Sequence, residues 1–101
     1  MIIYNTTFHV EDEILSESIE YLKHAFIPAV ISSGVLSRPV LQRVVQEEEA
    51  GASLCVQFRV KDQETLQNWI DQKGIDIQHK LVERFGNKMV GFSTLLDEID
   101  L

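Results

Sequence analysis

The sequence predicts one α+β domain, residues 1–101, built from four strands and two helices. Three observations predict it. Apolar residues alternate in four short segments, they recur at helical spacing in two longer ones, and the segments follow the order strand, helix, strand, strand, helix, strand. This order is typical of the split βαβ, or ferredoxin-like βαββαβ, arrangement. We therefore expect a four-stranded antiparallel sheet with two helices on one face.

The first strand is expected over residues 1–10, where β-branched and aromatic residues alternate with polar ones. Its even-numbered residues are the more apolar set, so we expect them to face the core. Three acidic residues then open a helix that should run to about Ser33, with Gly34 as its left-handed end. Pro28 lies inside this helix and deprives the His24 carbonyl of its hydrogen-bond donor, which predicts a kink.

The second half of the chain is expected to begin with a hairpin over residues 40–48 and 53–61. In its second strand Leu54 and Phe58 should face the helices, and the acidic run 47–49 should form the exposed tip. Asp62 is a good N-cap for the second helix, which Gly74 interrupts and Gly86 ends. A last strand is expected over residues 88–96.

Composition excludes several classes of protein. The chain carries 9 basic and 16 acidic residues, a net charge of -7, and such a surface repels the phosphates of nucleic acids. A single cysteine cannot form an internal disulfide, which argues against a secreted disulfide scaffold. No segment approaches the roughly 18 apolar residues of a membrane span, and no signal-peptide pattern is visible. We expect a cytoplasmic protein without nucleic-acid or membrane partners.

The sheet face opposite the helices is expected to be half apolar, because Ile3, Cys55 and parts of the second and last strands should lie on it. A small domain often buries such a face against a second copy. This predicts a homodimer in which two sheet faces enclose a barrel-like space, a dimeric α/β-barrel. The alternative is a monomer whose sheet is wetted on one side, which antiparallel sheets tolerate.

The candidate site is a group of polar residues on that same face. The first and third strands are central neighbours in this topology, so their polar side chains should lie near one another. These residues are Asn5, Thr7, His9, Gln57 and Arg59. They could bond to one another across a dimer interface, or bind a small ligand whose carboxylate or phosphate Arg59 recognises.

We expect neither a metal site nor a cofactor. His9, His24 and His79 lack the spacing of metal ligands, and the glycines form no phosphate-binding loop. Cys55 is expected to be a small buried residue instead of a reactive thiolate. Tyr4 and Trp69 are expected to be core residues.

Several short motifs resemble a small bacterial family of unknown function, and together they cover the whole chain. They are Ile2-Ile3-Tyr4-Asn5-x-Thr7, Ile27-Pro28 with Gly34, Val56-Gln57-Phe58, Arg84-Phe85-Gly86 and Val90-Gly91-Phe92-Ser93-Thr94-Leu95-Leu96. The resemblance implies a dimeric α/β-barrel, a group that includes cofactor-independent monooxygenases, haem-degrading enzymes and EthD-like proteins. Many members have His-Ile-Pro where this chain has Phe26-Ile27-Pro28, which counts against a histidine-based mechanism here.

Three functions follow as hypotheses. The first is a homodimeric small-ligand-binding or structural domain. The second is a cofactor-independent, monooxygenase-like enzyme that acts on a small aromatic or carboxylate compound, with Arg59 as the anchor and His9 or His24 as the base. The third is a regulatory partner of another protein that uses the acidic surface.

Overall fold

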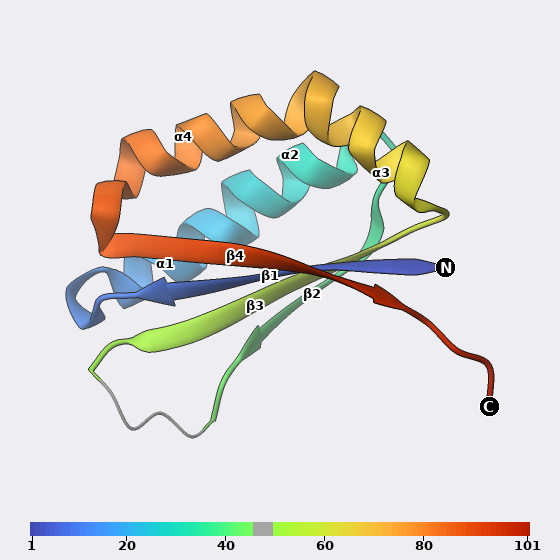
Figure 1. Ribbon diagram of the computed structural model, residues 1–101. Coiled ribbons are helices and arrows are strands. Elements are labelled where there is room, and N and C mark those ends of the chain that lie inside the picture. Colours follow the sequence, from blue (N-terminus) through green and yellow to red (C-terminus); the bar gives the residue numbers. More distant parts are fainter. Residues whose placement is uncertain (46–49) are drawn as a thin grey trace.

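The computed structural model describes residues 1–45 and 50–101. Within them, four strands form one antiparallel sheet in the spatial order β2-β3-β1-β4 (Figure 1). The strands are β1 (Ile2–Val10), β2 (Ser37–Arg43), β3 (Ala52–Val60) and β4 (Met89–Asp97). One helical segment connects β1 to β2 and another connects β3 to β4. This is the ferredoxin-like βαββαβ fold that the order of elements predicted.

The first helical segment contains the distortion that Pro28 predicts. It consists of η1 (Asp12–Ile14), α1 (Leu15–Tyr21), η2 (Leu22–Phe26) and α2 (Ile27–Ile31). The element η2 is a π-helical turn, in which the N–H of Ile27 donates to the carbonyl of Leu22. This wide turn lies directly before Pro28, which has no N–H to offer. Gly34, with a φ of 77°, follows the end of the segment as expected.

The second helical segment begins at the predicted N-cap. It consists of α3 (Gln63–Trp69), η3 (Ile70–Gly74), α4 (Ile75–Phe85) and η4 (Gly86–Lys88). The Asp62 carboxylate accepts a hydrogen bond from the Thr65 N–H at 2.8 Å, and this bond lowers the pKa of Asp62. Gly74 does not break the helix. It lies in a second π-helical turn, η3, so α3 and α4 form one continuous helical segment.

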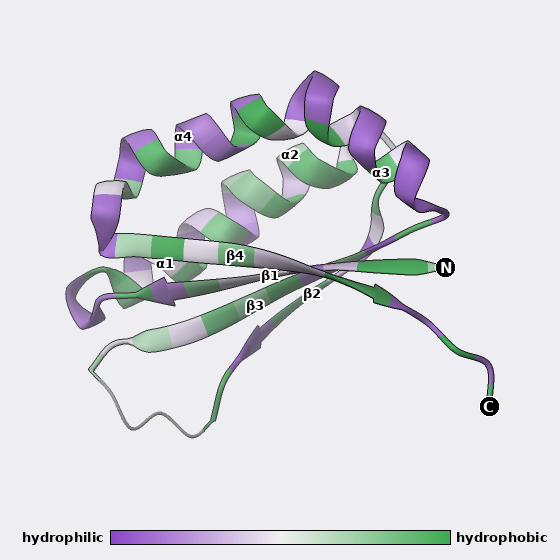
Figure 2. Cartoon of the chain, viewed as in Figure 1, coloured by the Kyte–Doolittle hydropathy of each residue, from purple (hydrophilic) through white to green (hydrophobic). Residues whose placement is uncertain are grey.

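Both helical segments cover the same face of the sheet (Figure 1). The alternate residues of β3 that point toward them are buried, among them Leu54 and Phe58. Phe26 of the first segment packs between two strands, with its ring centroid 5.8 Å from that of Phe8 and 6.5 Å from that of Phe58. Hydrophilic residues cover much of α3 and α4 in Figure 2. The predicted orientation of β3 is therefore confirmed.

The hairpin between β2 and β3 differs from its prediction at the first strand. β2 begins three residues earlier than expected, at Ser37, and its pairing with β3 shifts between Ser37 and Val40. Arg38, with a φ of 52°, lies within this shift. Such a bulge on an edge strand disturbs the alternation of side chains, which is why the sequence pattern is weak there. The predicted acidic tip, residues 47–49, lies outside the described residues.

Candidate functional site

The face of the sheet that the helices leave bare carries all five predicted site residues. We call it the uncovered face. The strand register places each odd-numbered residue of β1 between one residue of β3 and one of β4. The resulting rows are Arg59-Ile3-Leu96, Gln57-Asn5-Thr94, Cys55-Thr7-Phe92 and Ser53-His9-Val90. The sequence therefore predicted correctly which polar residues share a face.

Several polar residues on the central strands of the uncovered face are hydrogen-bonded to one another. The Asn5 amide nitrogen donates to the Thr7 hydroxyl at 3.4 Å, and that hydroxyl lies 3.6 Å from the Cys55 Sγ. Nearer the end of β1, His9 Nδ1 lies 3.2 Å from the Ser53 hydroxyl. These side chains are only half-buried, yet they already have partners within the chain. This favours the structural interpretation of the group over ligand binding.

Arg59 is engaged by an acid of its own chain. Its guanidinium makes two hydrogen bonds to the Glu98 carboxylate, at 2.7 and 3.1 Å, in the paired geometry that arginine favours with carboxylates. The bonds from Arg59 hold the pKa of Glu98 below its usual value. The Glu98 N–H also donates to the Met1 carbonyl, which fixes the start of the tail after β4. A ligand carboxylate at Arg59 would have to displace Glu98.

The strand register also separates the two ends of the predicted site. Arg59 lies opposite Ile3, and His9 lies six residues further along β1, which corresponds to about 20 Å. Within one subunit a small ligand cannot contact both side chains. His24 is further removed, since it lies in the helix layer with its side chain 74% exposed and 3.1 Å from the Glu20 carboxylate. The structure thus brings Asn5, Thr7 and Gln57 together, but not Arg59 with either histidine.

The outer strands give the uncovered face an apolar character. Val90, Phe92 and Leu96 of β4 lie on it, and Val40 of β2 lies opposite Gln57. All four are exposed, and Phe92 is 66% exposed. We call these four residues the apolar patch. The uncovered face therefore combines mostly polar residues on its two central strands with apolar residues on its two outer strands. We call the polar residues of the central strands the polar rows.

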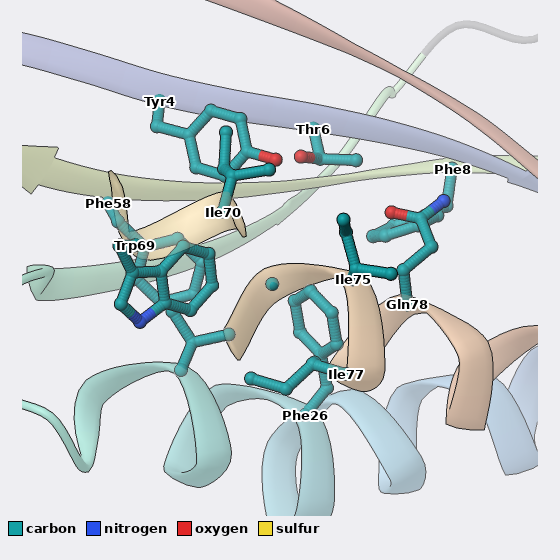
Figure 3. A pocket seen from close by; sticks show the side chains of 12 residues that line it. Tyr4, Thr6, Phe8, Phe26, Phe58, Trp69, Ile70, Ile75, Ile77 and Gln78 are labelled. Atoms are coloured by element: carbon teal, nitrogen blue, oxygen red, sulfur yellow. The ribbon is translucent and has the colours of Figure 1, made fainter. Parts of the chain in front are cut away.

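A cavity of about 100 Å³ lies on the other side of the sheet, between the strands and both helical segments (Figure 3). Its walls are mostly aromatic or aliphatic. The lining residues are Tyr4, Thr6, Phe8, Phe26, Val30, Phe58, Trp69, Ile70, Gly74, Ile75, Ile77 and Gln78. The cavity was not predicted from the sequence, in which Tyr4 and Trp69 have the pattern of ordinary core residues. Two polar residues on the helix-facing side of β1, Tyr4 and Thr6, were the available signal.

Gly74 keeps the cavity open. A Cβ atom at this position would lie 3.0 Å from Cζ3 of Trp69, closer than most side chains approach one another. The position is part of the π-helical turn η3, which widens the helix beside the cavity. The sequence shows Gly74 as an interruption of the apolar stripe, whereas the structure shows it as a lining residue of the cavity packed close to Trp69.

Residues 1–45 and 50–101 contain neither a cluster of metal ligands nor a helix that could span a membrane. No three His, Cys, Asp or Glu side chains gather there in a way that could hold a metal ion. No helix in this part of the chain is long and apolar enough to cross a membrane. The uncovered face and the cavity are therefore the two features to compare with known proteins.

The solved structures show the same fold at low sequence identity. An EthD family protein from Bacillus halodurans C-125 is 14% identical, with a TM-score of 0.71 over 98% of this chain and 100% of the other. A candidate antibiotic biosynthesis monooxygenase from Deinococcus radiodurans is 10% identical, with a TM-score of 0.72 over 100% and 95% of the two chains. A dimeric ferredoxin-like protein from an uncultured marine organism is 14% identical, with a TM-score of 0.63 over 100% and 99%.

At these identities the likeness shows the fold alone. No curated protein matches the sequence. The model of one protein family matches residues 1–99, which is nearly the whole chain. The chain belongs to that family, which is described as a domain of unknown function, DUF4286.

Proposed function

We propose that the chain acts as a homodimer in which two copies pack their uncovered faces together and form a dimeric α/β-barrel. The apolar patch is the observation that carries this proposal. A phenylalanine that is 66% exposed beside two exposed aliphatic residues on one strand is unfavourable in water. Removing such a side chain from water contributes about 1.5–3 kcal/mol, so a second copy that covers the patch would be stabilised by it.

The polar rows suit the centre of such an interface. A buried polar group destabilises an interface when it lacks a hydrogen-bond partner. Asn5, Thr7 and His9 each have a partner in their own chain, so a second copy that covers them leaves fewer polar atoms to be paired across the interface. A similar ferredoxin-like protein from an uncultured marine organism is described as dimeric, which supports a dimer here.

The mass of the protein in solution tests the dimer, and β4 offers a matched pair of variants. Leu95 and Leu96 are neighbours and are both 46% exposed, but they point to opposite sides of the sheet, because Leu95 lies opposite Tyr4 and Leu96 opposite Ile3. Light scattering after size-exclusion chromatography should find a dimer for the wild type and for Leu95→Asp. Leu96→Asp should be monomeric, since it would bury a carboxylate in the interface.

Two results would contradict the proposal. One is a wild-type protein that remains monomeric throughout the micromolar range. The other is equal dissociation by Leu95→Asp and Leu96→Asp, which would mean that the uncovered face has no special role.

A small-ligand role for the polar rows remains part of the proposal in a narrower form. Asn5, Thr7 and Gln57 would line any space left between the subunits, and Arg59 would contribute only after releasing Glu98. A thermal-shift screen can separate this site from the cavity. A ligand of the uncovered face should lose its stabilising effect in Arg59→Ala, whereas a ligand of the cavity should keep it.

A cofactor-independent, monooxygenase-like enzyme is the second candidate function. The described function of the similar protein from D. radiodurans suggests it, and a cavity with apolar walls would suit an aromatic substrate. Oxygen uptake in the presence of single-ring phenols, with the protein as the only catalyst, would support this function. A rate no higher than that of the buffer would oppose it.

We also propose that the protein is cytoplasmic and does not bind nucleic acids. A net charge of -7 supports the absence of nucleic-acid partners, and a filter-binding assay at low salt would test it. A cytoplasmic location would be tested by cell fractionation with an antibody against the chain.

A further inference from the structure

We propose that the cavity between the sheet and the helices is a binding site for a single-ring aromatic molecule that carries one neutral oxygen substituent, such as a phenol. This site is independent of the proposed dimer, because it lies on the other side of the sheet from the uncovered face. Three properties of the cavity lead to this class of ligand: its size, the character of its walls and the hydroxyl groups at one side.

The size of the cavity limits the ligand to one ring. Its volume is about 100 Å³. Apolar cavities of about 150 Å³ hold a benzene molecule, while sites for drug-sized ligands begin near 300 Å³. A single six-membered ring with a small adjustment of the walls therefore fits, and a fused two-ring system does not.

The walls favour an aromatic ring without a charge. Phe26, Phe58 and Trp69 approach the cavity from three different elements, so a bound ring could meet their edges or faces in the offset geometries that aromatic pairs prefer. The lining contains no lysine, arginine or histidine. A carboxylate would lose its hydration there without gaining a cation, so the cavity disfavours benzoate-like ligands.

A chain of three hydroxyl groups supplies the polar side. The Ser93 hydroxyl donates to the Tyr4 hydroxyl at 3.4 Å, and the Thr6 hydroxyl lies 3.0 Å from that of Ser93. Each hydroxyl has one proton, and Ser93 uses its own toward Tyr4, so Thr6 donates to Ser93. The Tyr4 proton is then left to donate to an oxygen of the ligand. Figure 3 shows the Tyr4 hydroxyl directed toward Thr6.

Two of the residues of α4 that line the cavity, Ile75 and Gln78, are exposed. Gln78 extends from this helix toward the strand that carries Thr6 and Phe8, and Ile75 beside it is 51% exposed (Figure 3). A ligand can therefore enter between α4 and β1 without unfolding the domain. Its ring would lie deep among the aromatic side chains and its oxygen near Tyr4.

Trp69 provides a direct measurement, because it lines the cavity and is the only tryptophan of the chain. Titrations of tryptophan fluorescence should show saturable binding of phenol and of toluene. Phenol should bind about 3- to 10-fold more tightly than toluene, since it gains one neutral hydrogen bond. Benzoate and naphthol should bind at least tenfold more weakly than phenol.

Matched variants place the ligand in the cavity. Val30 lines the cavity and Val82 of α4 lies outside it, so Val30→Phe should abolish phenol binding and Val82→Phe should preserve it. Gly74→Ala, which narrows the cavity against Trp69, replaces Val30→Phe if that variant does not fold. Tyr4→Phe should remove the preference for phenol over toluene and leave toluene binding unchanged.

The absence of saturable phenol and toluene binding to the wild type would overturn the proposal. So would binding of naphthol as tight as that of phenol, or phenol binding that survives in both Val30→Phe and Gly74→Ala. Equal loss of both ligands in Tyr4→Phe would contradict the role of the hydroxyl chain.

Discussion

The two faces of the sheet are built from the same strands but distribute polar and apolar residues in opposite ways. On the covered face the central strands are the most apolar part, with Val56 and Phe58 buried under the helices. On the uncovered face the central strands are mostly polar, with Asn5 and Thr7 at the middle, and the exposed apolar residues lie on the outer strands. Phe92, 66% exposed, is the largest apolar side chain on this face.

This difference fits the proposed dimer, in which one sheet would make two kinds of contact. The helices of the same chain are always present, so the covered face can rely on apolar packing with only a small cavity. In the proposed dimer a second copy would cover the uncovered face only above some concentration, so each subunit would also have to remain soluble alone. Hydrogen-bonded polar rows flanked by an apolar patch suit that requirement better than a fully apolar face.

The largest expected effect on stability comes from replacing one phenylalanine on each face of the sheet by alanine. Phe58→Ala should lower the free energy of unfolding by about 3–5 kcal/mol, because it leaves a hole in the core. Phe92→Ala should change the unfolding of the monomer by about 0.5 kcal/mol or less, because its side chain is exposed. Urea titrations at low protein concentration would measure both. If both variants lost a similar amount of unfolding free energy, the Phe92 side chain would be buried within the monomer, which would contradict this comparison.

A smaller effect is expected from two neighbouring residues of β4. A Cβ atom at Gly91 would lie 2.8 Å from Cδ1 of Phe8 and 3.2 Å from the Thr7 carbonyl oxygen, so Gly91→Ala should cost about 1–3 kcal/mol. Its neighbour Val90 points to the uncovered face, so Val90→Ala should change the stability of the monomer little. Thermal unfolding of both variants would check this contrast. A neutral Gly91→Ala would show that Phe8 can move aside freely.

The smallest effect concerns pH at the edge of the uncovered face. The pKa of Glu98 is lowered by its hydrogen bonds to Arg59, so the folded state binds this proton less readily than the unfolded state does. The stabilisation is therefore complete above the ordinary carboxyl pKa and is lost as the pH falls through the lowered value. Wild type and Glu98→Gln should differ in stability at neutral pH and converge in acid.

Asp97→Asn is the control for this comparison, because it removes one negative charge from the same end of β4. Unfolding curves recorded from neutral pH into acid would give the measurement. A difference between wild type and Glu98→Gln that does not shrink in acid would contradict the assigned cause.

Much of the fold could be predicted from the sequence, because alternation and helical spacing report directly which residues are buried. Leu54 and Phe58 face the helices as the pattern indicates. The weakly alternating second strand was placed less accurately, since a bulge near Arg38 changes which side its residues face. Asp62 and Gly86 marked the start of α3 and the end of α4 correctly, because capping is a local property.

The candidate site could be predicted only in part. Membership of a face follows from the parity of the residue numbers, but the distance of about 20 Å between Arg59 and His9 follows from the strand register. The partner of Arg59 lies in the tail, whose structure the sequence left open. The cavity was missed for another reason. Apolar periodicity shows which side chains point inward, but not whether they fill the space between them.

The position of Cys55 has a practical consequence. It is the only thiol of the chain, and it lies beside Thr7 in the middle of the uncovered face. The rate of Cys55 alkylation by a small maleimide or by iodoacetamide thus reports on the exposure of that surface, and no cysteine has to be introduced. If two copies meet there, the labelling rate should fall as the protein is concentrated, and mass spectrometry of the intact chain would follow it in real time.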